Sequence, residues 1–96
     1  MIIPSMMKFQ LGRLVITPAV LSTASVDEIC QAIDRHVCGQ WDEVPGLVGI
    51  CNESGLSHGG RLLSVHRLAN GVELHVLTTA DRLTTMVYLQ GEGERP

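Results

Sequence analysis

The chain has 96 residues and a formal net charge of −3, with 45% hydrophobic and 18% charged residues. This composition predicts one folded domain and excludes a disordered chain. Only Phe9, Trp41 and Tyr88 are aromatic, which argues against a platform on which nucleic-acid bases stack. The basic residues are scattered along the sequence, so direct binding of nucleic acid is disfavoured, whereas a protein partner is compatible with this surface charge.

The cysteine count and the N-terminal segment bear on location. Cys30, Cys38 and Cys51 form an odd number and no secretory signal is visible, so we expect reduced thiols and a cytoplasmic protein. The apolar start of the chain is interrupted by Pro4 and Lys8, which predicts neither a signal peptide nor a membrane span.

Two short elements are expected before residue 25. Leu14–Ile16 is rich in β-branched residues and predicts a short strand. Thr17 and Pro18 then form a helix-start signal, because Thr caps a helix and Pro fits its first position. We therefore expect a short helix from Pro18 to Leu21.

The next segment predicts a clearer helix. Ser25 and Glu28 have the spacing of a capping box, and apolar residues then follow at helical intervals up to Gly39, which supplies a left-handed stop. Residues 46–60 contain five glycines among apolar and polar residues. We expect a short, imperfect helix there, closed by Gly59 and Gly60.

The last third predicts a hairpin. Asn70-Gly71 between alternating apolar runs favours a two-residue type I′ turn, and residues 84–90 supply a third strand. In that register His66 lies opposite His75. The residues expected on the core face are Leu63, Val65, Leu74 and Val76, and those expected on the open face are Ser64, His66, Glu73, His75 and Leu77.

These elements together predict an α+β fold. We expect a three- or four-stranded antiparallel sheet with one or two short helices packed on one face. Residues 1–96 form a single domain in this interpretation, with residues 1–7 and 91–96 flexible.

Asp81 and Arg82 lie in the expected connection between the second and third strands. A structural interpretation is that Asp81 caps the turn through backbone amides while Arg82 is solvated or salt-bridged. The functional alternative is that Arg82, on a loop held by a rigid sheet, contacts a partner. No base or nucleophile stands beside the pair, so we expect no catalytic residue here.

Other residues that bear chemistry form no recognised site. His36, His58 and the cysteines lack the close ligand pairs of a structural zinc site, so we expect no metal and no other cofactor. The cysteines are expected to be small buried hydrophobes and the histidines to lie on the surface. No oriented Cys–His pair is evident, and we expect a protein that is not an enzyme.

A set of residues remains as candidates for binding a partner. Trp41 follows a helix on a loop, where it would anchor an interface or cover the edge of the core. His66 and His75 would share the open face of the hairpin. The full candidate set is Trp41, Asp42, Arg61, His66, His75, Asp81 and Arg82.

Several stretches resemble a family of small bacterial proteins encoded on plasmids, phages and genomic islands. The matching stretches are LGRLVITPAVL (11–21), RHVCGQWDEV (35–44) and GGRLLSVHRLANGVELHVLTTADRLTT (59–85). The matching motif residues are Arg35, His36, Gly39, Trp41, Asn52, Gly59, Arg61, Leu62, Ser64, Thr78, Asp81, Arg82 and Thr85. The sequence departs from the family pattern at Thr79, where an acidic residue is usual, and at Leu83, where Ser is usual.

The resemblance implies an accessory protein of a mobile element. Members of the family are often labelled restriction–modification subunits, but no methyltransferase cofactor loop is present in this chain. The first hypothesis is therefore a non-enzymatic protein-binding module that docks on a larger nucleic-acid-processing complex, as an inhibitor or accessory factor of a bacterial defence system such as restriction or CRISPR interference. The alternative is a small DNA-associated regulator, a homodimer whose Arg61, Arg67 and Arg82 line one surface.

Overall fold

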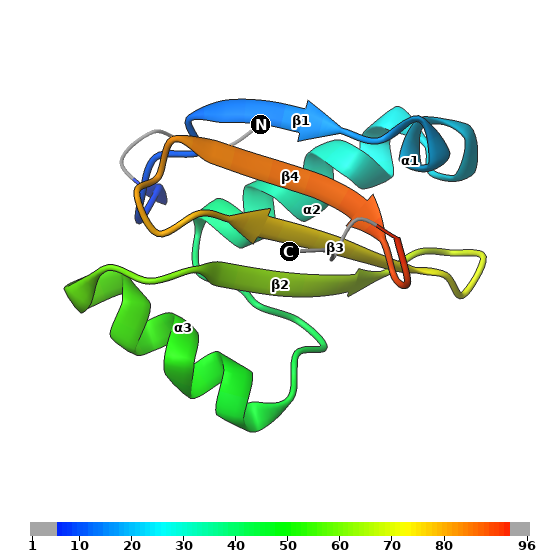
Figure 1. Cartoon of the computed structure of the whole chain (residues 1–96). Helices are drawn as coiled ribbons and strands as arrows, with labels where there is room; N and C mark the ends of the chain where they lie inside the picture. Colours follow the sequence, from blue (N-terminus) through cyan, green and yellow to red (C-terminus); the bar gives the residue numbers. More distant parts are fainter. Residues whose placement is uncertain (1–5, 93–96) are drawn as a thin grey trace.

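A computed structural model describes residues 6–92 of the chain, so the expectations for residues 1–5 and 93–96 lie outside the described residues. The elements are β1 (Arg13–Ile16), α1 (Pro18–Thr23), α2 (Val26–Val37), α3 (Gly46–His58), β2 (Leu62–Arg67), β3 (Glu73–Thr78) and β4 (Thr84–Leu89). The strands form one sheet in the order β1-β4-β3-β2 (Figure 1). The α+β class with a four-stranded sheet is confirmed.

The sheet is mixed. β2, β3 and β4 form the expected antiparallel meander, whereas β1 pairs in parallel with β4, with Leu14 opposite Thr85. A parallel partner needs a long connection between the two strands. Here α1, α2, α3 and the β2–β3 hairpin all lie between β1 and β4 along the chain.

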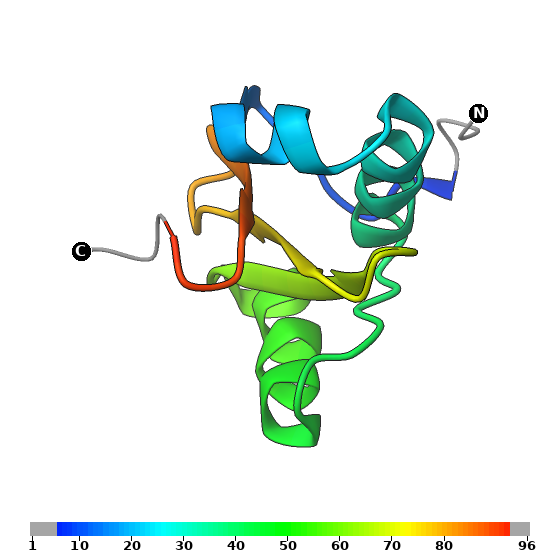
Figure 2. The same cartoon turned by 90° about the vertical axis from the view of Figure 1, so that its right-hand side faces the viewer.

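α1 and α2 begin where their capping signals predict. The Thr17 side chain accepts a hydrogen bond from the Val20 amide, and Ser25 and Glu28 form the reciprocal capping box. Gly39 follows α2 with a φ of 79°, the left-handed conformation that glycine adopts without strain. Both helices cover the same face of the sheet (Figure 2).

The core lies between these two helices and the sheet. Its buried members are Val20, Ile29, Ala32, Leu68, Leu74, Val76 and Val87. They come from α1, α2, the hairpin and β4, so burial of aliphatic surface joins the N-terminal helices to the C-terminal strands.

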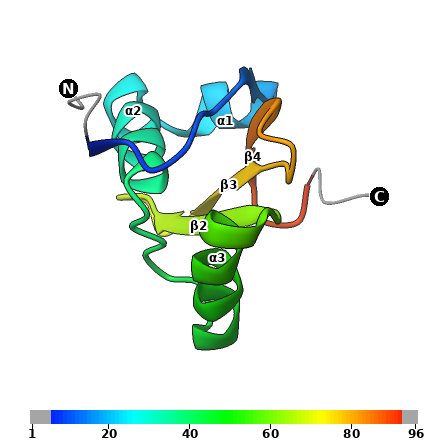
Figure 3. The ribbon, with the colours of Figure 1, turned by 90° about the vertical axis from the view of Figure 1, so that its left-hand side faces the viewer.

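α3 is longer than expected and lies on the other side of the sheet from α1 and α2, against β2 (Figure 3). Asn52 at its middle donates to the Leu63 carbonyl oxygen at 2.7 Å and accepts from the Leu63 amide at 3.0 Å. These two bonds satisfy backbone groups on the outer edge of β2, which would otherwise stay unpaired.

The expected hairpin register is wrong by one residue. Leu68 and Val72 close the turn, so the loop has three residues, Ala69 to Gly71, and Gly71 is left-handed with a φ of 88°. An Asn-Gly pair also suits this loop, in which glycine forms the bulge.

The shift exchanges the two faces of β2. Ser64 pairs with Val76 and His66 pairs with Leu74, so both polar residues point into the core beside α2. Leu63 and Val65 point to the opposite face. His66 and His75 are therefore not opposite each other, because His75 pairs with Val65.

Candidate functional site

Six short hydrogen bonds form a continuous chain through the core, which we call the polar network. In order, they join Asp42 Oδ2 to His66 Nδ1 (2.7 Å), His66 Nε2 to Ser64 Oγ (2.7 Å), Ser64 Oγ to His36 Nδ1 (2.7 Å), His36 Nε2 to Thr78 Oγ1 (2.8 Å), Thr78 Oγ1 to Thr85 Oγ1 (2.7 Å), and Thr85 Oγ1 to the Leu11 carbonyl oxygen (2.7 Å). The network thus connects the segment before β1, α2, the loop after α2 and three strands.

The alternation of the strands brings these side chains together. Ser64, Thr78 and Thr85 occupy inward positions on three adjacent strands, and His36 reaches them from the last turn of α2. All four are fully buried, and His66 is nearly so. Buried polar groups need hydrogen-bond partners, and the network supplies them.

Burial controls the charge of the two histidines. It lowers the pKa of His36 to about 3, with smaller contributions from His66 and Arg82, so His36 is neutral at pH 7. Burial also lowers the pKa of His66, although the hydrogen bond and charge of Asp42 act in the opposite direction.

Asp42, His66 and Ser64 have the connectivity of a hydrolase triad, in which a carboxylate orients a histidine and the histidine contacts a hydroxyl. A nucleophile must also be reachable by a substrate. Ser64 is completely buried, and its oxygen is within hydrogen-bond distance of His36 as well. The arrangement can hold and orient protons, but Ser64 does not face a substrate.

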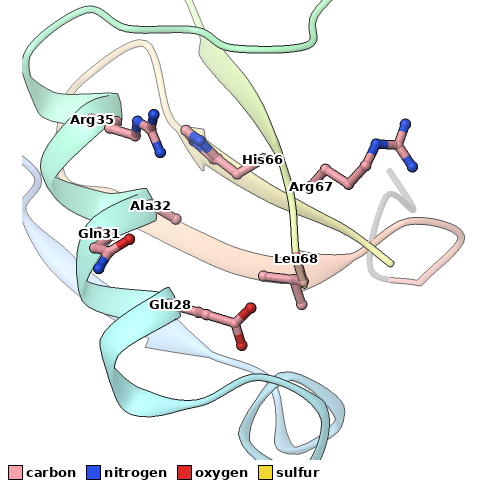
Figure 4. Close-up of a pocket in the computed structure, with 7 residues that line it drawn as sticks. All are labelled: Glu28, Gln31, Ala32, Arg35, His66, Arg67 and Leu68. Atoms are coloured by element: carbon pink, nitrogen blue, oxygen red, sulfur yellow. The ribbon is translucent and has the colours of Figure 1, made fainter. Parts of the chain in front are cut away.

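The network meets solvent at a small cleft between α2 and the end of β2 (Figure 4). The cleft has a volume of about 100 Å³, and its lining residues are Glu28, Gln31, Ala32, Arg35, His66, Arg67 and Leu68. This volume is comparable to a few water molecules. It gives His66 a route to solvent protons.

Trp41 lies in the interior rather than on an exposed loop surface. Its ring packs on Phe9 and on His36, and its Nε1 donates to Glu53 of α3 at 2.7 Å. The backbone of Trp41 and Glu43 continues the coverage of the β2 edge through two hydrogen bonds to Val65. Trp41 therefore joins α2, α3 and β2.

The Asp81-Arg82 turn is organised as the structural interpretation predicts for Asp81. Asp81 Oδ1 accepts from the Thr79 hydroxyl and the Leu83 amide. Arg82 is half-buried and binds backbone carbonyl groups. Its guanidinium donates to the carbonyl oxygens of Gly55, Gly60, Thr79 and Ala80 and lies over the Phe9 ring.

The remaining candidate residues are dispersed. Arg61 is exposed, whereas His75 is buried, with its ring centroid 5.3 Å from that of Tyr88. Arg67 pairs with Glu43 and Glu73, so the arginines expected to line one surface do not form a free basic face.

The side of α3 that faces away from the sheet exposes apolar side chains. Leu47 is 73% exposed and Ile50 is 68% exposed, and Cys51 is exposed beside them at helical spacing. The only carboxylate of α3, Glu53, accepts from Trp41. We call Leu47, Ile50 and Cys51 the α3 face.

The expected places of two thiols and of three histidines were wrong. Cys30 and Cys51 are exposed, whereas His36, His66 and His75 are buried. The position of His36 in the last turn of α2 suited an exposed cation at the helix C-terminus, but the polar strand residues beneath it make burial possible. Within residues 6–92, no three His, Cys, Asp or Glu side chains gather as metal ligands, and no helix is long and apolar enough to cross a membrane.

Sequence reasoning missed the polar network as a unit. A signal was present, since His36, Ser64, Thr78 and Thr85 all belong to the motifs on which the resemblance rests. The one-residue register error placed Ser64 and His66 on the open face and concealed their meeting with His36.

Comparisons with known proteins add no further constraint, since no family model, curated protein or solved structure matches this chain.

Proposed function

We propose that this protein is a non-enzymatic protein-binding module that docks through the α3 face. The observation that carries the proposal is the exposure of Leu47 and Ile50 on adjacent turns of one helix. Single exposed apolar residues are ordinary, whereas neighbouring ones on a rigid element suit an interface.

The anchoring of α3 supports this role. Its inner side is fixed by polar contacts: Asn52 binds the β2 edge, Glu53 accepts from Trp41, and Arg82 donates to the Gly55 carbonyl. These polar contacts hold the helix while Leu47 and Ile50 remain exposed. A pre-positioned apolar face lowers the entropy lost on binding.

The resemblance to mobile-element proteins indicates the kind of partner. We infer a subunit of a bacterial defence complex, such as a restriction or CRISPR interference complex, with this protein as an inhibitor or accessory factor. The partner surface would be an apolar groove or helix that accepts Leu47 and Ile50. The acidic net charge favours a basic rim around that groove.

The test compares three baits in host lysate: wild type, Leu47→Glu/Ile50→Glu, and the matched control Leu21→Glu/Leu83→Glu. Leu21 and Leu83 are 61% and 67% exposed on other elements, so the control adds the same charge elsewhere. A photo-crosslinker attached to Cys51, in a background in which Cys30 and Cys38 are replaced by Ser, identifies proteins that touch the α3 face. The proposal requires a cross-linked partner that the control retains and the α3 variant loses.

Identical capture by all three baits would remove the α3 face from the proposal. Light scattering of the purified protein separates a second copy of the chain from a foreign partner. A gel shift with duplex DNA at low salt tests the DNA-associated alternative, for which the proposal expects no binding.

A further inference from the structure

The polar network has fewer hydrogens available than it has hydrogen-bond contacts when both histidines are neutral. Its six contacts each need one hydrogen between two heavy atoms at 2.7 or 2.8 Å. The three hydroxyls of Ser64, Thr78 and Thr85 supply three, and two neutral imidazoles supply two more. The two ends, the Asp42 carboxylate and the Leu11 carbonyl, only accept. Five hydrogens therefore serve six contacts.

The Leu11 carbonyl fixes the directions of three bonds, as far as His36, and the neutral charge of His36 fixes the next two. Thr85 must donate to the Leu11 carbonyl, so Thr78 donates to Thr85, and His36 donates to Thr78 through Nε2. A neutral His36 then accepts at Nδ1 from the Ser64 hydroxyl. Ser64 has no second hydrogen, so it accepts from His66 Nε2.

His66 also faces a carboxylate. Its Nδ1 lies 2.7 Å from Asp42 Oδ2, and a lone pair there would oppose a negative charge. We propose that the polar network is a proton-binding site that holds one proton beyond those of neutral histidines, and that this proton resides on His66 as an imidazolium facing the Asp42 carboxylate.

The alternative with five protons leaves two lone pairs in contact somewhere along the network. Such a buried contact at under 3 Å loses a hydrogen bond and adds repulsion. Burial lowers the pKa of His66 and so favours its neutral form, but the neutral ring would turn a lone pair either to the Asp42 carboxylate or to the Ser64 oxygen, and the geometry of these two contacts favours the imidazolium. The side chain of Asp42 is 22% exposed, and Arg35 Nε lies 3.7 Å from its Oδ2.

Other charges face the site from each neighbouring element. Arg35 on α2 and His75 on β3 act against a charged His66, and Arg82 in the β3–β4 turn acts against a charged His36. Glu28 and Arg67 line the cleft beside His66 with opposite charges. Protons reach His66 through this cleft.

The first test is nitrogen NMR of the imidazoles in labelled protein at pH 7. The proposal expects protons on both nitrogens of His66 and on Nε2 alone of His36. A singly protonated His66 in the wild type would overturn it, and so would a proton on His36 Nδ1.

Thr85→Val tests the count from a distance, because residue 85 contacts neither His66 nor Asp42 through any bond of the network. The variant removes one hydroxyl and two contacts, so four contacts remain with four hydrogens. His66 is then expected to be neutral, and the proton of His36 should move from Nε2 to Nδ1. Thr84→Val, on the outward side of the same strand, is the control and should leave both histidines as in the wild type. If Thr85→Val, folded by its amide spectrum, behaves like this control, the count is wrong.

Asp42→Asn completes the set. Asp42 has a φ of 58°, which asparagine tolerates well, and its amide supplies the sixth hydrogen to His66 Nδ1. His66 should become neutral while His36 keeps its proton on Nε2. A doubly protonated His66 in this variant would contradict the proposal.

The same count predicts a dependence of stability on alkaline pH. Above the ordinary histidine pKa of about 6.5, the folded wild type holds one proton more than the unfolded chain. Its folding equilibrium constant should therefore fall as pH rises, by up to about tenfold per pH unit, until His66 deprotonates. Thr85→Val and Asp42→Asn should lack this component, and an equal decline in both variants would count against the proposal.

Discussion

Asn52 positions α3 through one side chain. Both of its polar atoms bind the backbone of Leu63, and the residue is 2% exposed. Asn52→Leu leaves an amide and a carbonyl of the β2 edge without these partners, and it should lower the free energy of unfolding by about 2–4 kcal/mol. Urea titration measures this change. Asn70→Leu is the control, because exposed Asn70 accepts from only the Val72 amide, and an equally large loss there would contradict the role of Asn52.

Arg82 fixes the other end of α3. Its fork donates to Gly55 at the end of the helix and to Gly60, Thr79 and Ala80. Arg82→Lys keeps the charge and loses this planar set of donors, so we expect a loss of about 1–3 kcal/mol in the free energy of unfolding. The matched control is Arg61→Lys on the exposed surface. Equal effects of the two substitutions would show that the guanidinium contacts contribute nothing special.

The length of the β2–β3 loop determines which side chains of β2 point toward the core. Gly71 has a φ of 88°, and a Cβ built on it meets no atom within 4 Å, so only backbone strain penalises a side chain there. Gly71→Ala should lower the free energy of unfolding by about 1–2 kcal/mol. Gly46→Ala is the control, since this helical glycine is equally open and has no positive φ. A thermal melt in which both variants match the wild type would rule out the left-handed loop.

Local signals predicted the elements well and their pairing less well. The caps at Thr17 and Ser25 and the stop at Gly39 are interactions within a few residues, so the sequence shows them directly. The loop at Asn70-Gly71 was located correctly, but two loop lengths suit the same dipeptide. Choosing between them requires the packing of α2 on the sheet, which local sequence does not contain.

At the scale of the whole molecule, long-range contacts limit what can be predicted from the sequence. The polar network joins residues up to 74 positions apart, and Arg82 binds Gly55 from 27 positions away. No periodicity or spacing encodes such partners. Polar residues at alternate positions of apolar strands, such as Ser64 and Thr78, do indicate a satisfied polar core, provided that the strand register is correct.

The whole molecule should lose stability in mild acid because of His36. Its pKa is lowered to about 3 in the folded protein, whereas the unfolded chain takes up this proton near pH 6.5. Between these values the unfolded state binds more protons, so the free energy of unfolding falls as pH falls, by up to about 1.4 kcal/mol per pH unit. Hydrogen bonds lower the pKa of the Glu28, Asp81 and Glu92 carboxyls, so their stabilisation is lost only at more acidic pH, below their ordinary values.

The range from pH 6.5 to 4.5 therefore isolates the histidines, and urea titrations across it provide the measurement. His36→Gln retains groups that bond Ser64 and Thr78 but does not titrate. The slope of its free energy of unfolding against pH should therefore be smaller than that of the wild type, by the contribution of up to about one proton. His58→Gln, which changes an exposed histidine outside the polar network, is the control. If His36→Gln and the wild type have the same slope, then His36 gains a proton in the folded state and the polar network does not keep it neutral.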